Sequence, residues 1–193
     1  KNVEQYLVKK IKKKDIVVFA GKLPPGTDRS IYQKWVPALQ KQGVEVFLDA
    51  QGEALSLAIK KTPFLIKPNQ KELEELVGKE NLTFDETVQA GKRLSEHGIK
   101  KVVISMGETG ALFIDETATL FAQAPKVPVL STVGAGDGMV AACVASHRKE
   151  RSLLETAKWA IATSAATVMQ PGTQPAFFHD IQKLYSKVKV SFL

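Results

Sequence analysis

Cysteine is nearly absent from this sequence, with Cys143 alone among 193 residues. A single cysteine cannot form an intramolecular disulfide, which excludes a disulfide-stapled secreted scaffold and suggests a reducing compartment. Cys143 lies in the apolar run 139–145, so we expect a small core residue rather than a reactive thiol. No apolar run reaches the ~18 residues that a membrane span requires. We therefore expect a cytoplasmic protein that makes no membrane contact.

The charge is unbalanced, with 27 Lys and Arg against 20 Asp and Glu, a formal net charge of +7. A nucleic-acid partner is one interpretation of such a surplus. The lysines are dispersed, however, and their one cluster, KKIKKKD at 9–15, has no interleaved aromatic residues. We favour a solvated helix end with a general attraction for anionic ligands, and we expect no nucleic-acid partner.

Hydrophobic periodicity predicts alternating strands and helices. The expected strands are apolar without alternation, which is typical of a parallel sheet covered by helices on both faces. We predict a three-layer α/β/α sandwich with a mostly parallel sheet, and one domain over 1–193. The strands are expected at 15–21, 43–50, 63–69, 100–107, 110–115 and 118–124. The helices are expected at 2–12, 28–42, 52–60, 70–78, 83–98, 135–147, 152–168 and 177–187.

Ligands of such sheets bind outside the carboxyl ends of the strands. Four residues fall at or just after predicted strand ends: Gly21, Asp49, Asn69 and Gly107. We expect them to gather on one rim.

The stretch STVGAGDGMVAACVA, residues 131–145, combines a glycine turn, an aspartate and the start of an apolar helix. It is not a P-loop, and Met139 occupies the third glycine position of the dinucleotide fingerprint. Such a turn leaves backbone N–H groups free to bind an anion. The helix dipole favours the ionised carboxylate of Asp137, which suits a general base in phosphoryl transfer. The alternative is a capped helix start that uses glycine only to turn.

Two further segments have both a functional and a structural interpretation. In KPNQKE (67–72), Asn69 and Glu72 lie three apart and could hold hydrated Mg²⁺, but N-x-x-E is also a common helix start. In SMGETG (105–110), a strand-end serine and two glycines could admit a nucleotide phosphate or ribose, or could form a hairpin turn.

Taken together, STVGAGDGMVAA closely resembles the second signature of the PfkB-type carbohydrate kinases of the ribokinase-like superfamily. GKLPPG, LDAQGEAL, KPNQKELEEL and SMGETGAL fall where that family has similar segments. The resemblance covers essentially the whole chain and is closest to the branch of 1-phosphofructokinase and tagatose-6-phosphate kinase. It implies phosphoryl transfer from ATP, with Mg²⁺, to a phosphorylated ketohexose. Fructose 1-phosphate is the expected acceptor, and tagatose 6-phosphate or another sugar is the alternative.

The resemblance also implies roles for individual residues. Asp137 resembles the catalytic base, and Gly134, Ala135 and Gly136 resemble the anion hole for the transferred phosphoryl group. Asn69 and Glu72 match the pair that organises Mg²⁺ through water. Positions similar to nucleotide contacts are Lys67, Ser105, Gly107, Gly110 and, beside the adenine, Ser164. Ser131, Val133 and carbonyls near Gly172 match the surroundings of a potassium ion in relatives.

Three residues depart from the family pattern: Lys22 and Gln51 replace small residues such as serine, and Gly138 replaces the serine after the aspartate. Lys22 either adds a phosphate contact or blocks the sugar-phosphate pocket. The chain also lacks the family's front segment, which carries the first strands, sugar contacts and a dimer-forming lid. We therefore expect the C-terminal portion of a kinase that is a homodimer when whole, and we expect this portion to be a monomer. The alternative is nucleotide binding without turnover.

Overall fold

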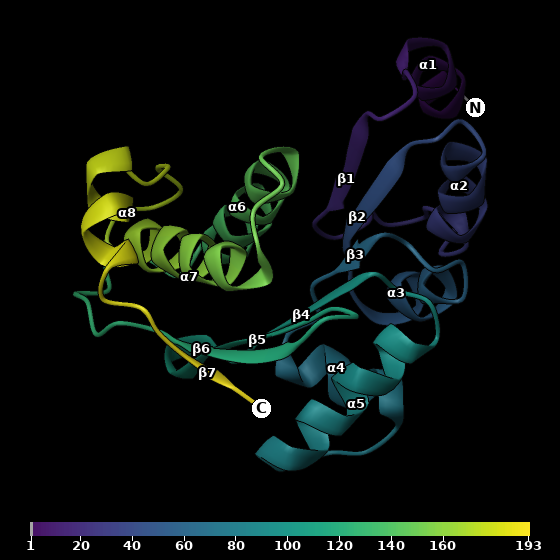
Figure 1. The fold of residues 1–193 in the computed structure, drawn as a ribbon. Coiled ribbons are helices and arrows are strands. Elements are labelled where there is room, and N and C mark those ends of the chain that lie inside the picture. Colours follow the sequence, from purple (N-terminus) through teal and green to yellow (C-terminus); the bar gives the residue numbers. More distant parts are fainter. Residues whose placement is uncertain (1) are drawn as a thin grey trace. The chain divides into compact units, whose positions relative to one another are not determined.

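The computed structural model describes residues 2–193. They form two compact units, of which one ends at Lys101 and the other spans Val102–Leu193. Figure 1 shows strands and helices in both, which is the predicted α/β class. The single domain over 1–193 stays a prediction.

The first unit contains a parallel sheet in the order β1-β2-β3. Ile16 pairs with Glu45 and Phe47 pairs with Leu65, as crossovers through helices require. Its elements are α1 (Asn2–Lys10), β1 (Ile16–Ala20), α2 (Ile31–Gln40), β2 (Glu45–Asp49), α3 (Gly52–Ile59), β3 (Leu65–Ile66), α4 (Gln70–Val77) and α5 (Phe84–Glu96).

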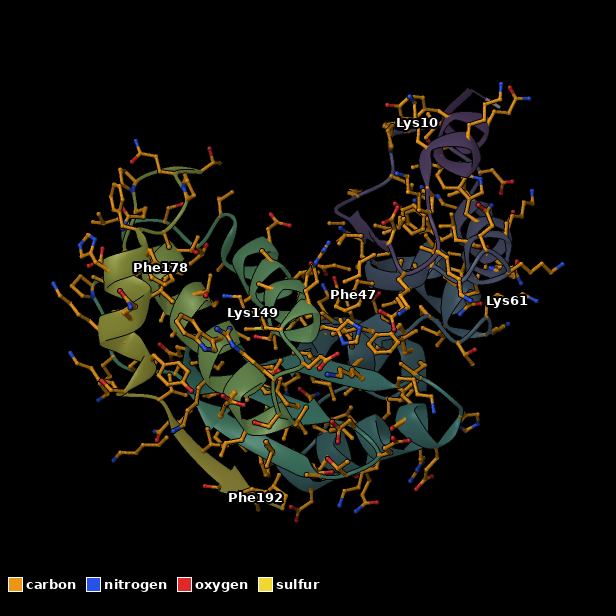
Figure 2. The ribbon with its side chains drawn as sticks, turned by 45° about the horizontal axis from the view of Figure 1, so that its top comes forward. Lys10, Phe47, Lys61, Lys149, Phe178 and Phe192 are labelled. Atoms are coloured by element: carbon orange, nitrogen blue, oxygen red, sulfur yellow. The ribbon has the colours of Figure 1, made fainter. Side chains whose placement is uncertain are left out.

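The core of the first unit is built on β2. Phe47 is fully buried and stacks on Phe64 with 5.5 Å between ring centroids, and it lies deep among the side chains in Figure 2. Each such apolar side chain contributes about 1.5–3 kcal/mol when fully buried. β1 is less buried than its sequence predicts, with Val18 40% exposed. Among the described residues β1 pairs only with β2, so it is an edge strand.

Local side-chain chemistry decides where the helices of this unit begin. Capping boxes start α4, at Asn69, and α5, at Thr83, as their sequences predict. α2 was expected from Asp28 but begins at Ile31. The Asp28 carboxylate instead accepts hydrogen bonds from the N–H and hydroxyl of Ser30, which closes a turn before the helix.

The second unit is antiparallel, in the order β4-β5-β6-β7. The prediction of mostly parallel strands therefore holds for the first unit and is corrected for the second. The connections between β4 and β5 and between β5 and β6 are too short for parallel crossovers, and β7 returns after three helices to pair antiparallel with β6. Its elements are β4 (Lys101–Ser105), the 3₁₀ turn η1 (Gly107–Thr109), β5 (Gly110–Ile114), β6 (Thr119–Gln123), α6 (Ala135–Arg148), α7 (Leu153–Val168), α8 (Phe178–Tyr185) and β7 (Lys189–Phe192).

Small residues let α7 pack closely in the second unit. Ala157, Ala160 and Ala166 are fully buried, and α7 lies between α6 and α8 in Figure 1, against β5 and β6. Cys143, on α6, is also buried, which confirms it as a core residue. Within residues 2–193, no helix has both the length and the apolar character needed to span a bilayer.

At Gly110 the backbone of β5 leaves no room for a side chain against β6. A Cβ atom at this residue would lie 2.0 Å from the carbonyl oxygen of Ala122, and its φ of +131° disfavours other residues. We predict that Gly110→Ala lowers the free energy of unfolding by more than ~3 kcal/mol, because the opposing backbone must move. Urea denaturation followed by circular dichroism measures this.

Gly107 provides the matched control. Its φ is +59°, but a Cβ atom would have open space around it. Gly107→Ala should therefore cost only about 1–2 kcal/mol from backbone strain. Equal losses in the two variants would contradict the close approach at Gly110.

Candidate functional site

The turn before α6 presents backbone donors to solvent. Gly134 caps the helix in the left-handed conformation, with φ of +83°, and Asp137 is exposed in the first helical turn. Among the described residues, the N–H groups of Gly136 and Asp137 have no hydrogen-bond partner. Unpaired N–H groups at a helix N-terminus attract anions. The turn thus combines unpaired N–H groups, which suit an anion, with an adjacent carboxylate that is open to solvent.

The end of α7 holds this turn in place. The N–H groups of Leu130 and Ser131 both donate to the carbonyl of Val168, at 2.8 and 3.2 Å. The Ser131 hydroxyl accepts a hydrogen bond from the N–H of Val133 at 3.2 Å. Ser131 and Val133, matched to a potassium site, therefore lie in the same short loop.

Gly138 lies where α6 meets α7. A Cβ atom at Gly138 would be 2.8 Å from Oγ1 of Thr167, whose hydroxyl donates to the Thr163 carbonyl. The missing side chain therefore lets the first turn of α6 approach α7 closely. Gly138 is the residue that replaces the serine of the family pattern, and this close contact is where the replacement acts in the structure.

The residues matched to nucleotide contacts in the second unit are spread over two regions. Ser105, Gly107 and Gly110 lie in or beside the β4–β5 connection, which forms the hairpin that was the structural interpretation of SMGETG. Ser164 is half-buried on α7. Their contacts with a nucleotide stay a prediction.

In the first unit, Lys67 is paired rather than free. Its Nζ lies 3.1 Å from Oδ1 of Asp49, and the Lys67 side chain is only 7% exposed. A buried charge is stable only with such a partner. Asp49 was predicted for the rim but not as the ion-pair partner of Lys67. Its position at the end of a strand was the feature of the sequence that could have indicated this pair.

Asn69 and Glu72 bond to each other across the first turn of α4. The Asn69 side chain accepts from the N–H of Glu72, and the Glu72 carboxylate accepts from the N–H of Asn69, both at 2.8 Å. Their structural interpretation as a helix start is thus confirmed. Burial raises the pKa of Glu72, while the Asn69 hydrogen bond and the charge of Lys67 oppose this effect.

Those two side chains could still serve a cation. Within residues 2–193, no group of three or more His, Cys, Asp or Glu side chains is arranged to hold a metal ion. Mg²⁺ keeps most of its waters and needs few protein ligands, so this pair suits a water-mediated site. A half-buried carboxylate whose charge is poorly solvated also gains from a nearby cation.

A cavity of about 420 Å³ opens beside this pair. The rim residues Gly21 and Asn69 both line it, and the N–H of Gly21 donates to the Asp49 carbonyl at 3.1 Å. Gly107, also predicted for the rim, belongs to the second unit. The lining comprises Gly21, Lys22, Leu23, Arg29, Tyr32, Ala50, Gln51, Gly52, Ala54, Asn69, Lys71, Glu72 and Glu75.

Sequence reasoning did not single out Arg29, Tyr32 or Lys71 from that lining. Arg29 follows the LPPG turn, and Lys71 stands inside the KPNQKE segment, so closeness to two motifs was the only signal. Tyr32 is buried and stacks on Phe19 with 4.7 Å between ring centroids.

Two α/β units, with a solvent-facing glycine turn and carboxylate in one and a polar cavity in the other, fit a carbohydrate-phosphorylating enzyme. The chain belongs to the pfkB family of carbohydrate kinases, which it matches over residues 1–179. It is 36% identical to 1-phosphofructokinase of Haemophilus influenzae over 180 residues, 93% of this chain and 58% of that protein. It is 37% identical to 1-phosphofructokinase of Bacillus subtilis over 179 residues, again 93% and 58%.

A solved structure also places the chain beside the phosphofructokinases. Phosphofructokinase-2 from Escherichia coli, in complex with potassium, superimposes with a TM-score of 0.91 at 36% identity, covering 96% of this chain and 60% of that one. The predicted ribokinase-like α/β fold is thereby confirmed. The chain spans less than two thirds of the length of each of these relatives.

We predict that Glu72→Gln weakens the binding of Mg-ATP without lowering the stability of the fold. A raised pKa means that the folded protein favours the neutral carboxyl, so ionisation costs stability as the pH rises through the folded value. Glutamine removes that cost and can still close the capping box. The melting temperature at pH 7 should stay equal or rise, while calorimetry should show Mg-ATP affinity falling roughly ten-fold.

Glu86→Gln is the matched control, because Glu86 fills the equivalent position in the capping box of α5. Its pKa is lowered to about 2, first by the hydrogen bond from Lys79 and then by Thr83. The stability from this ionised group is present at neutral pH and is lost as the pH falls toward that value. Glu86→Gln should lower the melting temperature and leave Mg-ATP affinity unchanged. The reverse pattern would rule out a cation role for Glu72.

Proposed function

We propose that this chain is the ATP-binding and catalytic portion of a sugar-phosphate kinase. The reaction transfers the γ-phosphoryl group of ATP to a hydroxyl of fructose 1-phosphate and yields fructose 1,6-bisphosphate and ADP. One observation supports it above the others: two unpaired N–H groups stand directly beside an exposed carboxylate, at Gly136 and Asp137. The relatives named 1-phosphofructokinase support the choice of acceptor.

In this mechanism the acceptor hydroxyl oxygen forms a bond to the γ-phosphorus as the bond from that phosphorus to the bridging oxygen breaks. Asp137 accepts the hydroxyl proton, and ADP leaves with the bridging oxygen. The N–H groups of Gly136 and Asp137 stabilise the charge on the transferred group. Most of the rate enhancement then comes from positioning and charge stabilisation.

Mg²⁺ would neutralise phosphate charge, and Asn69 and Glu72 would hold its waters. Lys67, Ser105, Gly107, Gly110 and Ser164 would contact the nucleotide. Ser131 and Val133, with carbonyls near Gly172, would surround a potassium ion. The crystal structure of E. coli phosphofructokinase-2 in complex with potassium supports this proposal, because that relative binds the ion.

The remaining alternatives concern the acceptor and the extent of catalysis. Tagatose 6-phosphate or another sugar would use the same base and anion site. Nucleotide binding without turnover is the alternative from another functional class. A homodimer is expected for the whole enzyme, and one structure of E. coli phosphofructokinase-2 is described as tetrameric.

We predict that Asp137→Asn lowers kcat with fructose 1-phosphate roughly 10²–10⁴-fold, because asparagine cannot accept the proton. ATP affinity should change only a few-fold, since the backbone donors are retained. Release of ADP from Mg-ATP, with and without the sugar phosphate, measures turnover, and calorimetry measures affinity.

Asp85→Asn is the control, because Asp85 also lies in the first turn of a helix, α5. It should leave both quantities unchanged. Undiminished turnover in Asp137→Asn would refute the assigned base. An unmodified chain that binds Mg-ATP but releases no ADP would favour nucleotide binding without turnover.

A further inference from the structure

The cavity of the first unit carries positive charge on one element and negative charge on another. Lys22 and Arg29 reach it from the loop between β1 and α2. Glu72 and Glu75 reach it from α4, together with Lys71. Its volume of about 420 Å³ lies within the range of about 300–1,000 Å³ that is typical of small-molecule sites.

The three cations of this cavity have no ionic partner among the described residues. Within residues 2–193, no ion pair involves Lys22, Arg29 or Lys71. Other lysines of the unit are engaged by carboxylates: Lys34 by Asp28, Lys67 by Asp49 and Lys79 by Glu86. The cavity therefore gathers three cations that form no ion pair with a described side chain.

The nearest acidic neighbour of Arg29 in the sequence is already occupied. The Asp28 carboxylate accepts hydrogen bonds from Ser30 N–H at 2.8 Å, Ser30 Oγ at 2.7 Å and Lys34 Nζ at 2.7 Å. These donors, led by Lys34, hold the pKa of Asp28 well below its usual range. With Asp28 satisfied, the Arg29 guanidinium is available for an anion, and its planar fork matches a phosphate group.

The acidic side of the cavity is arranged differently. One oxygen of Glu72 is bound to the N–H of Asn69, so this carboxylate is fixed at the start of α4 rather than turned toward the loop cations. Sugar hydroxyls can donate to carboxylates, whereas a phosphate dianion is repelled by them. A ligand with one dianionic end and several hydroxyls therefore matches both sides.

We propose that Lys22 and Arg29, with Lys71 as an additional charge, hold the phosphate group of the acceptor sugar in this cavity. This inference rests on the proposed function and extends it by assigning specificity to three residues. It also decides between the two interpretations of Lys22. An exposed, unpaired lysine at a cavity wall attracts a dianion and can move aside at little cost, so it contacts the phosphate rather than blocks the pocket.

The test is calorimetric titration of the 193-residue chain with fructose 1-phosphate, unphosphorylated fructose and Mg-ATP. Fructose 1-phosphate should bind at least ten-fold more tightly than fructose. Lys22→Met, Lys22→Ser and Arg29→Met should each weaken fructose 1-phosphate binding roughly ten-fold or more, because each removes a charged hydrogen-bond donor. Mg-ATP affinity should stay within two-fold of the unmodified chain.

Lys61→Met is the matched control, since Lys61 is an exposed lysine at the surface of the same unit in Figure 2 and does not line the cavity. It should change nothing. The three side chains that the four variants replace are exposed, so melting temperatures should match that of the unmodified chain and show that each variant is folded.

Several outcomes would overturn the inference. One is that the unmodified chain does not bind fructose 1-phosphate, and another is that it binds fructose and fructose 1-phosphate equally well. A third is that Lys22→Ser binds fructose 1-phosphate more tightly, which would show that Lys22 blocks the pocket. Weaker Mg-ATP binding in the Lys22 and Arg29 variants would assign the cavity to the nucleotide instead. Failure of the proposed function looks different, because the unmodified chain would then not bind Mg-ATP.

Discussion

The left-handed turn at Gly134 is the constraint on which the proposed chemistry depends. Gly134 takes φ of +83° where the chain enters α6, and among the described residues the N–H groups of Gly136 and Asp137 have no hydrogen-bond partner. A residue with a Cβ atom would pay a steric cost in that conformation. The Val168 carbonyl fixes the preceding residues, Leu130 and Ser131, so the turn is held from its other end as well. The unpaired donors thus follow a loop that is hydrogen-bonded to the end of α7.

A second constraint operates in the first unit. The parallel strands β1, β2 and β3 bring Gly21, Asp49 and Lys67 to one end of their sheet. The buried pair of Lys67 and Asp49 ties the exits of β2 and β3 together, immediately before the capping box that opens α4. The position of Asn69 and Glu72 beside the cavity follows from this sequence of contacts.

Much of this could be predicted from the sequence, because the deciding interactions are local. Capping boxes at Asn69 and Thr83 and the glycine turn at 134 depend on residues within four positions of one another. The antiparallel pairing of β7 with β6 was not predicted, because it joins Phe192 to Leu120, 72 residues away along the chain. The same holds for the Lys67–Asp49 pair and for the meeting of Arg29 and Lys71 in one cavity. These contacts depend on tertiary packing between residues far apart in the sequence, which a local sequence pattern does not predict.

The central claim is that the glycine turn of α6 binds the terminal phosphates of ATP. It is tested most directly by calorimetric titration of the 193-residue chain with ATP and with AMP, both in the presence of Mg²⁺. Our account predicts that ATP binds roughly ten-fold or more tightly than AMP, because only ATP carries the phosphates that reach the N–H groups of Gly136 and Asp137. Equal affinities, or no detectable binding of ATP, would contradict it.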